Sequence, residues 1–163
     1  MATENSTLTQ EYLHSLFDYK VGNLYWKKYE YPRRKNLLAG TKGTINRIYI
    51  KLNGKTYLAH RLIFLYHKGY LPKFIDHIDN NPLNNKIENL REATHTQNTQ
   101  NRKLSVTNKC GYKGVSKYQN KYVAQIQING VKKNLGYFKT PSEAHEAYKK
   151  EADKSFGQFA RYK

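Results

Sequence analysis

The sequence is poor in several residue types, and each scarcity excludes a class of protein. A single cysteine, Cys110, among 163 residues excludes a disulfide-stapled fold and a cysteine-rich zinc site. The longest apolar stretch, around Leu62 to Tyr66, is too short to span a bilayer. The first residues predict no secretory signal, because no basic segment is followed by an apolar one. Acidic residues are also scarce: 12 Asp and Glu stand against 29 Lys and Arg.

This imbalance gives a formal net charge of +17, which favours an anionic partner. Nucleic acid, an anionic membrane and an acidic protein all have the required charge. The 15 tyrosines and 6 phenylalanines are too many for a disordered basic tail. We therefore expect a folded, soluble, basic protein of one domain or two small ones.

Periodicity predicts helices and hairpins in the first half of the chain. Residues 8–17 and 60–68 read as helices, and Gly69 ends the second one. Gly22-Asn23 and Asn53-Gly54 read as hairpin turns. His60 lies beside an apolar helical face, so we expect a hydrogen-bonded core residue.

Three strand-like runs mark the second half: residues 112–118, 121–128 and 131–138. Thr140 to Glu143 form a capping box with proline at the first helical position, and Gly157 ends the helix. These signals predict a three-stranded antiparallel sheet packed on one helix. A polar stretch without periodicity suggests a boundary, which gives domains at 1–102 and 111–163 and a linker at 103–110.

The segment from Phe74 to Arg102 is rich in Asn, His and Asp and reads as strand, loop, strand and helix. Asp76 and His77 end its first strand. Adjacent strand residues point to opposite faces, so this pair predicts a local bend. His95 and Asn98 lie on its helix. Carboxylate and amide oxygens suit Mg²⁺ or Mn²⁺, and an imidazole can deprotonate water for attack on a phosphodiester.

The same segment resembles the HNH (ββα-metal) nuclease motif of phage and intron homing endonucleases. The matching residues are Asp76-His77, Asn85, Glu88-Asn89-Leu90-Arg91 and Gln97-Asn98. The resemblance implies that His77 is the general base and that Asp76 and Asn98 are metal ligands. It also implies that Asn89 pins the loop and orients the histidine. His95 lies one helical turn before Asn98, and it either faces the phosphate or serves as the second ligand.

Residues from Gly111 to Ala160 resemble the APETALA/ethylene-response-factor DNA-binding domain. Matching pieces include Lys113-Gly114-Val115 and Leu135-Gly136-Tyr137-Phe138. In that family the sheet enters the major groove, which a β-ribbon fits. The positions that the resemblance assigns to base contacts are Lys113, Ser116, Tyr118, Gln125, Gln127, Lys132 and Asn134.

Together these features predict an α+β protein in which a ββα-metal HNH nuclease domain, with its core motif at 74–102, precedes the sheet domain. We expect a homing-type endonuclease that uses Mg²⁺ or Mn²⁺ on double-stranded DNA and leaves 5′-phosphate and 3′-hydroxyl ends. A bacterial cytoplasm, a monomer, no membrane and no obligatory protein partner are expected. Arg33, Arg34, Lys35 and Arg47 are expected to follow DNA phosphates. The alternatives are a non-cleaving DNA-binding regulator and an RNA-binding protein that stacks bases on tyrosines.

Overall fold

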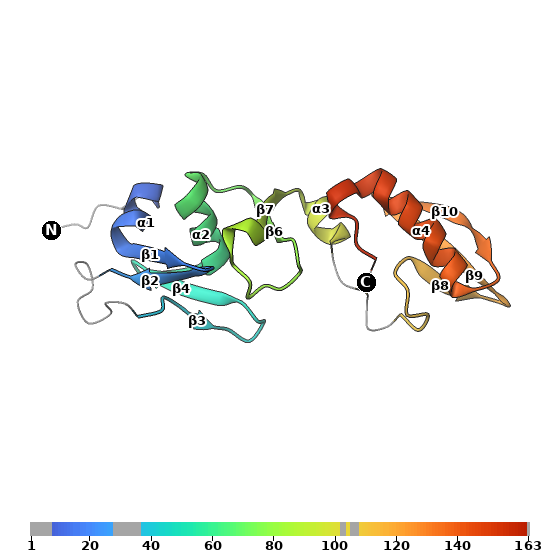
Figure 1. Ribbon diagram of the computed structural model, residues 1–163, viewed down its shortest axis with the longest axis horizontal. Helices are drawn as coiled ribbons and strands as arrows, with labels where there is room; N and C mark the ends of the chain where they lie inside the picture. Colours follow the sequence, from blue (N-terminus) through green and yellow to red (C-terminus); the bar gives the residue numbers. More distant parts are fainter. Residues whose placement is uncertain (1–7, 28–36, 102–103, 105–107, 163) are drawn as a thin grey trace. The chain divides into compact units, whose positions relative to one another are not determined.

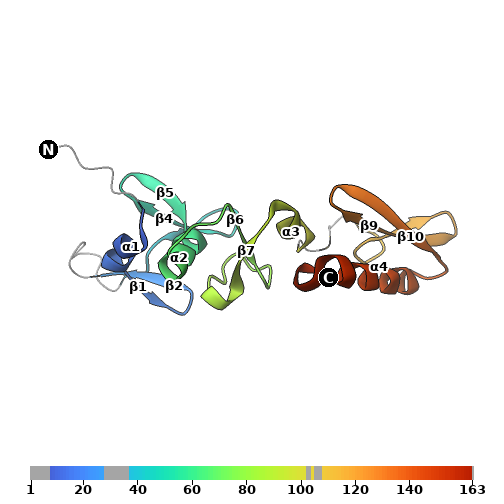
Figure 2. The same ribbon diagram turned by 90° about the horizontal axis from the view of Figure 1, so that it is seen from above.

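The computed structural model describes residues 8–27, 37–101, 104 and 108–162. Packing divides the chain into two compact units, Met1–Ala93 and Thr94–Lys163 (Figures 1 and 2). None of the helices in the described residues is both long and apolar enough to cross a membrane. Arg33, Arg34 and Lys35, which were expected to follow phosphates, lie outside the described residues.

The first unit combines two helices with small antiparallel sheets. Its elements in chain order are α1 (Gln10–Leu16), β1 (Phe17–Lys20), β2 (Asn23–Trp26), β3 (Thr41–Lys42), β4 (Ile48–Leu52), β5 (Lys55–Leu58), α2 (Ala59–Lys68), β6 (Phe74–His77), η2 (Ile87–Asn89) and β7 (Leu90–Ala93). Both predicted hairpins are present as β1–β2 and β4–β5, but the first turn is Val21-Gly22, one residue earlier than predicted, because Lys20 pairs with Asn23. Gly69 ends α2 with a φ of 76°, a left-handed conformation that glycine adopts without strain.

Helix α2 carries the central part of the core of the first unit. Its Leu62 and Ile63 are fully buried. Burial of an aliphatic side chain of this kind stabilises the fold by about 1.5–3 kcal/mol. The buried side chains that share this core include Leu13, Leu16, Phe17, Leu24, Trp26, Ile50, Leu52, Ile75 and Leu90. Because Ile75 belongs to β6 and Leu90 to β7, the core fixes β6, which carries Asp76 and His77, and the strand that pairs with it.

Strands β6 and β7 form a two-stranded antiparallel ribbon. Asp76 lies opposite Arg91, and His77 lies opposite Leu90. The pairing runs to the end of β6 without a register shift, so the bend predicted at Asp76-His77 is wrong. Both side chains are nevertheless buried, because each face of the ribbon supplies its own partners.

The second unit contains α3 (His95–Gln100), β8 (Val115–Tyr118), β9 (Lys121–Ile128), β10 (Val131–Phe138), α4 (Pro141–Phe156) and η3 (Gly157–Phe159). The sheet is antiparallel in the order β10-β9-β8, and α4 packs on one face, as predicted. The α+β fold class is confirmed. The packing boundary lies after Ala93 and groups α3 with this unit. The division into functional domains at 1–102 and 111–163 stays a prediction.

Two small clusters form the core of the second unit. Val115, Ala124 and Ala144 make one cluster, and Ile126, Tyr148 and Ala152 make the other. Apolar residues on alternate positions of β9 therefore meet the apolar stripe of α4. The polar residues between them are left on the opposite face of the sheet, where they are exposed.

Candidate active site

The imidazole of His77, at the end of β6, is buried and only 8% exposed. Its Nε2 lies 3.0 Å from the side-chain oxygen of Asn85, which is also buried. Because an amide oxygen can only accept, Nε2 donates and carries the proton of the neutral ring. The basic nitrogen is then Nδ1, and a ring in this state can take a proton from water.

Two histidines share this buried environment. The ring of His60 lies edge-on to that of His77, with centroids 5.1 Å apart. Burial lowers the pKa of His60 to about 3, and the charges of His77 and Arg47 add to this effect. Burial also lowers the pKa of His77. The hydrogen bond to Asn85 opposes this effect, and the charge of Arg47 adds to it. Both rings are therefore neutral at pH 7. His60 is a core residue, as predicted.

Asp76 precedes His77 and is held by the facing strand. Its Oδ2 accepts from Arg91 Nε at 2.9 Å and from a terminal guanidinium nitrogen of Arg91 at 2.8 Å. The carboxylate is 4% exposed, so this ion pair lies in a region of weak solvent screening. The cross-strand register places the two side chains together and fixes the orientation of the carboxylate.

Asn89 holds the loop between β6 and β7. Its Nδ2 donates to Asp79 Oδ1 at 2.9 Å and to the carbonyl of Asn84 at 2.7 Å, and its Oδ1 accepts from Asp79 N at 3.0 Å. Partial burial raises the pKa of Asp79, but hydrogen bonds from Asn84, Asn81 and Asn89 outweigh it and lower the pKa overall. Asn89 therefore contacts the loop, whereas Asn85 accepts the hydrogen bond from the His77 ring.

The first hairpin supports the segment that carries Asn85. Tyr19 Oη accepts a hydrogen bond from Ile87 N at 3.1 Å. At the hairpin turn, Gly22 has a φ of 82°, and a Cβ there would lie 2.8 Å from Lys86 N. Glycine is needed on both counts. Residues well before the motif therefore help to position the partner of His77.

Asn98 and His95 lie on α3, which belongs to the second unit. Thr94 caps this helix: its hydroxyl accepts from Gln97 N, and the Gln97 side chain accepts from Thr94 N. The side chain of His95 is exposed, and that of Asn98 is half-buried. The assignment of either residue as a metal ligand beside Asp76 stays a prediction.

Oxygen atoms dominate the ligand set predicted for a metal. Among the described residues, no three His, Cys, Asp or Glu side chains gather into a metal-binding group. Mg²⁺ and Mn²⁺ favour oxygen ligands, and Mg²⁺ keeps several waters in its coordination sphere.

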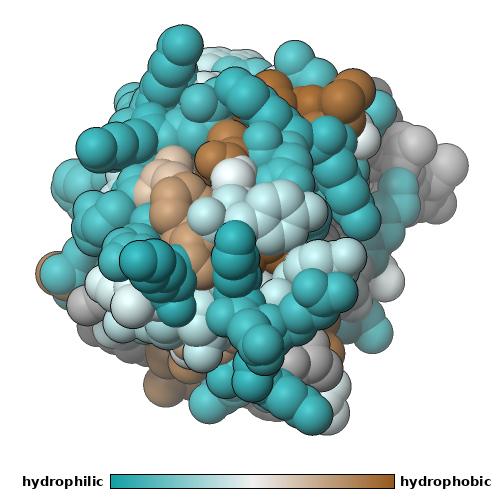
Figure 3. Space-filling model, turned by 90° about the vertical axis from the view of Figure 1, so that its right-hand side faces the viewer, coloured by the Kyte–Doolittle hydropathy of each residue, from teal (hydrophilic) through white to brown (hydrophobic). Residues whose placement is uncertain are grey.

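The outer face of the second sheet carries six of the seven residues predicted to contact bases, and all six are exposed: Ser116, Tyr118, Gln125, Gln127, Lys132 and Asn134. Hydrophilic side chains cover most of the end of this unit that faces the viewer in Figure 3. Two of the six make local hydrogen bonds. Gln127 donates to the carbonyl of Gly130, and Asn134 accepts from Gly136 N at the β-bulge.

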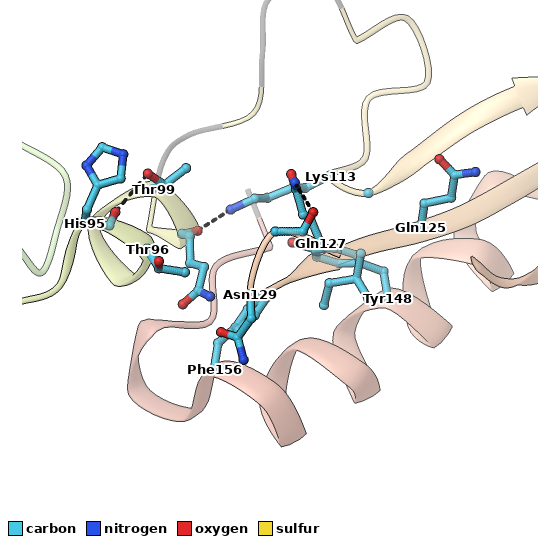
Figure 4. A pocket seen from close by; sticks show the side chains of 13 residues that line it. His95, Thr96, Thr99, Lys113, Gln125, Gln127, Asn129, Tyr148 and Phe156 are labelled. Atoms are coloured by element: carbon cyan, nitrogen blue, oxygen red, sulfur yellow. Dashed lines mark hydrogen bonds between the residues drawn. The ribbon is translucent and has the colours of Figure 1, made fainter. Parts of the chain in front are cut away.

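Lys113 differs from the other six residues. It is half-buried, and its ammonium donates to the carbonyl of Gln100 at 2.6 Å (Figure 4). Burial lowers its pKa to about 8, and the charge of Arg161 adds to this effect. His145 Nδ1 lies 3.2 Å from the carbonyl of Lys113. Lys113 thus lines a pocket beside α3, together with Gln125 and Gln127 of the sheet.

Three features of the site had no role in the sequence-based prediction. Asn85 and Arg91 belong to the matched motif, but their partners could not be predicted. The long loop between β6 and β7 permits more than one register of strand pairing. Strand pairing alone places Arg91 opposite Asp76. The support from Tyr19 and Gly22 has no sequence signal, because it joins segments more than sixty residues apart.

Comparison with known proteins identifies part of the chain. Residues 57–100 match the family model described as HNH endonuclease. The match covers Asp76, His77 and Asn98, the segment for which the sequence predicts an HNH nuclease motif. The resemblance of the C-terminal segment to the APETALA/ethylene-response-factor domain stays a prediction.

Three relatives come from viruses or a prophage. A protein of Acanthamoeba polyphaga mimivirus named as an uncharacterized HNH endonuclease is 39% identical over 62% of this chain and 54% of its own length. Protein 3.8 of Escherichia phage T7 is 49% identical over 30% of this chain and 38% of its own. An SPbeta prophage protein of Bacillus subtilis, named as an HNH homing endonuclease, is 34% identical over 49% and 47%. The chain thus spans about half or less of each relative. No solved structure matches significantly.

Proposed function

We propose that this protein is a divalent-metal-dependent endonuclease of the homing type that hydrolyses phosphodiester bonds in double-stranded DNA. One observation carries the proposal: within residues 57–100, consecutive positions of β6 carry a buried carboxylate and a buried neutral imidazole, and each is held by its own partner. Water activation at neutral pH requires an unprotonated base, and the environment of His77 keeps that base neutral.

The proposed roles follow the geometry on β6 and the family resemblance. His77 Nδ1 takes the proton from the attacking water, while Asn85 holds the opposite edge of the ring. Asp76 is a ligand for the metal, with Arg91 fixing its orientation. Asn98 supplies a second oxygen ligand, and Asn89 maintains the loop. The products are a 5′-phosphate and a 3′-hydroxyl.

The residues present fit Mg²⁺ or Mn²⁺. Both bonds from Arg91 go to Oδ2 of Asp76, and a carboxylate oxygen with an amide oxygen is a hard donor set of the kind these ions prefer. The bound cation supplies positive charge that stabilises the phosphate as negative charge develops on it. His95 has one of two roles. It is a catalytic residue that faces the phosphate, or it is the second metal ligand in place of Asn98.

DNA affinity in this proposal comes from basic residues of the first unit and from the outer face of the second sheet. Lys132, Gln125 and Tyr118 lie exposed there, and Arg47 adds a cation near His60 and His77. The chain acts as a monomer without an obligatory protein partner, in the cytoplasm of a bacterial host. It requires no membrane.

The test is cleavage of a mixed population of duplex DNA with Mg²⁺, with the ends mapped by sequencing. We expect His77→Ala to cut on the order of 10²–10⁴ times more slowly, since it removes the general base. Its DNA affinity should match the wild type. EDTA should stop cleavage without unfolding the protein.

Binding without metal-dependent cleavage by the wild type would instead favour the regulator, and preference for RNA over duplex DNA would favour the RNA-binding alternative. Wild-type turnover by His77→Ala would refute the assignment of the base. Loss of activity in His95→Ala together with an active Asn98→Ala would move the second ligand to His95.

A further inference from the structure

The C-terminal end of helix α3 is held by Lys113, a residue that precedes the sheet of the second unit. The ammonium of Lys113 donates to the carbonyl of Gln100, the last residue of α3, at 2.6 Å. The backbone of Lys113 is itself held, because His145 of α4 bonds to its carbonyl. Figure 4 shows the lysine side chain extending from the sheet domain to the helix across one side of the pocket.

A helix as short as α3 depends on tertiary contacts such as the one with Lys113. It has six residues, and none of them is fully buried. Helices much shorter than about 12 residues are marginal in water unless tertiary contacts hold them. The Thr94 side chain caps the first turn of α3. At the other end of the helix, Gln100 is followed by Asn101 in a right-handed conformation, not by a glycine in the left-handed conformation that ends many helices. The Lys113 ammonium satisfies a terminal carbonyl, where the helix dipole favours a cation.

We propose that Lys113 is a positioning residue that fixes the C-terminal end of α3 and thereby the proposed metal ligand Asn98. Gln100 follows Asn98 by two residues, so fraying of the last turn would disorder the ligand. This inference rests on the proposed function for its kinetic consequence. It also assigns to Lys113 a different role from the base contact that the sequence predicts, because its ammonium is hydrogen-bonded to the carbonyl of Gln100.

The experiment compares Lys113→Met with two matched variants that lose the same charge. Lys132→Met removes an exposed lysine of the outer face, and Lys150→Met removes an exposed lysine of α4. Three quantities are measured: kcat and KM for DNA cleavage, the Mg²⁺ concentration that gives half the maximal rate, and the salt dependence of DNA affinity. Amide exchange across residues 95–101 is followed in parallel.

We expect Lys113→Met to lower kcat or to raise the Mg²⁺ requirement by about 10- to 100-fold, the range for residues that orient a metal ligand. DNA affinity should stay within about twofold, allowing for one lost surface charge, and α3 should exchange faster. Lys113→Arg, which keeps a donor, should restore part of the rate. Lys132→Met should instead weaken DNA binding, and Lys150→Met should resemble the wild type.

Each measurement has an outcome that would contradict the proposal. Weakened DNA binding, a salt slope lower by about one and an unchanged kcat would make Lys113 a DNA contact. Unchanged exchange in α3 would also overturn the proposal. If Lys113→Met does not fold, Lys113→Leu, which also lacks a donor, replaces it. Should the wild type not cleave DNA at all, the proposed function fails, while the exchange measurement still decides whether Lys113 fixes α3.

Discussion

His77 combines burial with basicity at the scale of a single residue. Its Nε2 faces Asn85, so the neutral ring has one protonation pattern, with Nδ1 as the base. Burial disfavours the imidazolium and lowers the pKa of His77. A base with a lowered pKa is fully available at pH 7, although it is intrinsically weaker.

The pH dependence of cleavage should reflect this environment. We expect kcat/KM to stay level as the pH falls from 8 and to decline only below about pH 6.5, the ordinary histidine pKa. Asn85→Asp places a carboxylate at the Nε2 edge, which favours the imidazolium and should move the decline to higher pH. Rate profiles of the two proteins between pH 4.5 and 8 check this. A wild-type decline centred above pH 6.5 would contradict it.

At the scale of elements, β9 separates its functions by alternation. Ala124 and Ile126 are buried against α4, whereas Gln125 and Gln127 are exposed on the outer face. This parity could be predicted from the sequence because a strand has a period of two. Helix α4 was also predictable: its capping box, N-terminal proline and terminal Gly157 are all present.

Substitutions on β9 and β10 should therefore have different effects on each face. We expect Gln125→Ala to relax preference at one base pair by about 1–3 kcal/mol if the amide contact is bidentate. Lys133→Met lies on the helix side and breaks the ion pair with Glu151, so it should leave base preference unchanged. Binding to a library of duplexes at fixed salt measures both. Identical preference in Gln125→Ala and the wild type would argue against readout by this face.

At the scale of the whole molecule, stability should depend on pH through His60. The folded state favours its neutral ring, so the stabilisation is complete above pH 6.5 and is lost as the pH falls toward 3. The free energy of unfolding of the first unit should therefore fall by about 2 kcal/mol between pH 7 and pH 5 from this residue. Urea titrations followed by fluorescence of Trp26, the only tryptophan and a core residue of that unit, measure it.

His60→Asn provides the comparison, since it removes the titrating group. Its unfolding free energy is expected to be lower at pH 7 but to change less on acidification. If the unfolding free energies of the two proteins change equally with pH, the burial of His60 is not the cause of the pH dependence.

The local elements and the residue types on them could be predicted from the amino-acid sequence. Turn residues, caps and periodicity act between near neighbours, which is why the hairpins, α2, the second sheet and α4 were all predictable, as was the adjacency of Asp76 and His77. Tertiary structure alone decided the partners: Arg91 for Asp76, Asn85 for His77, and Gln100 for Lys113. These contacts depend on strand register, on loop geometry and on packing between distant segments. No local propensity encodes such contacts, and for this reason Lys113 carries the signature of a DNA contact in sequence but lies against a helix in the fold.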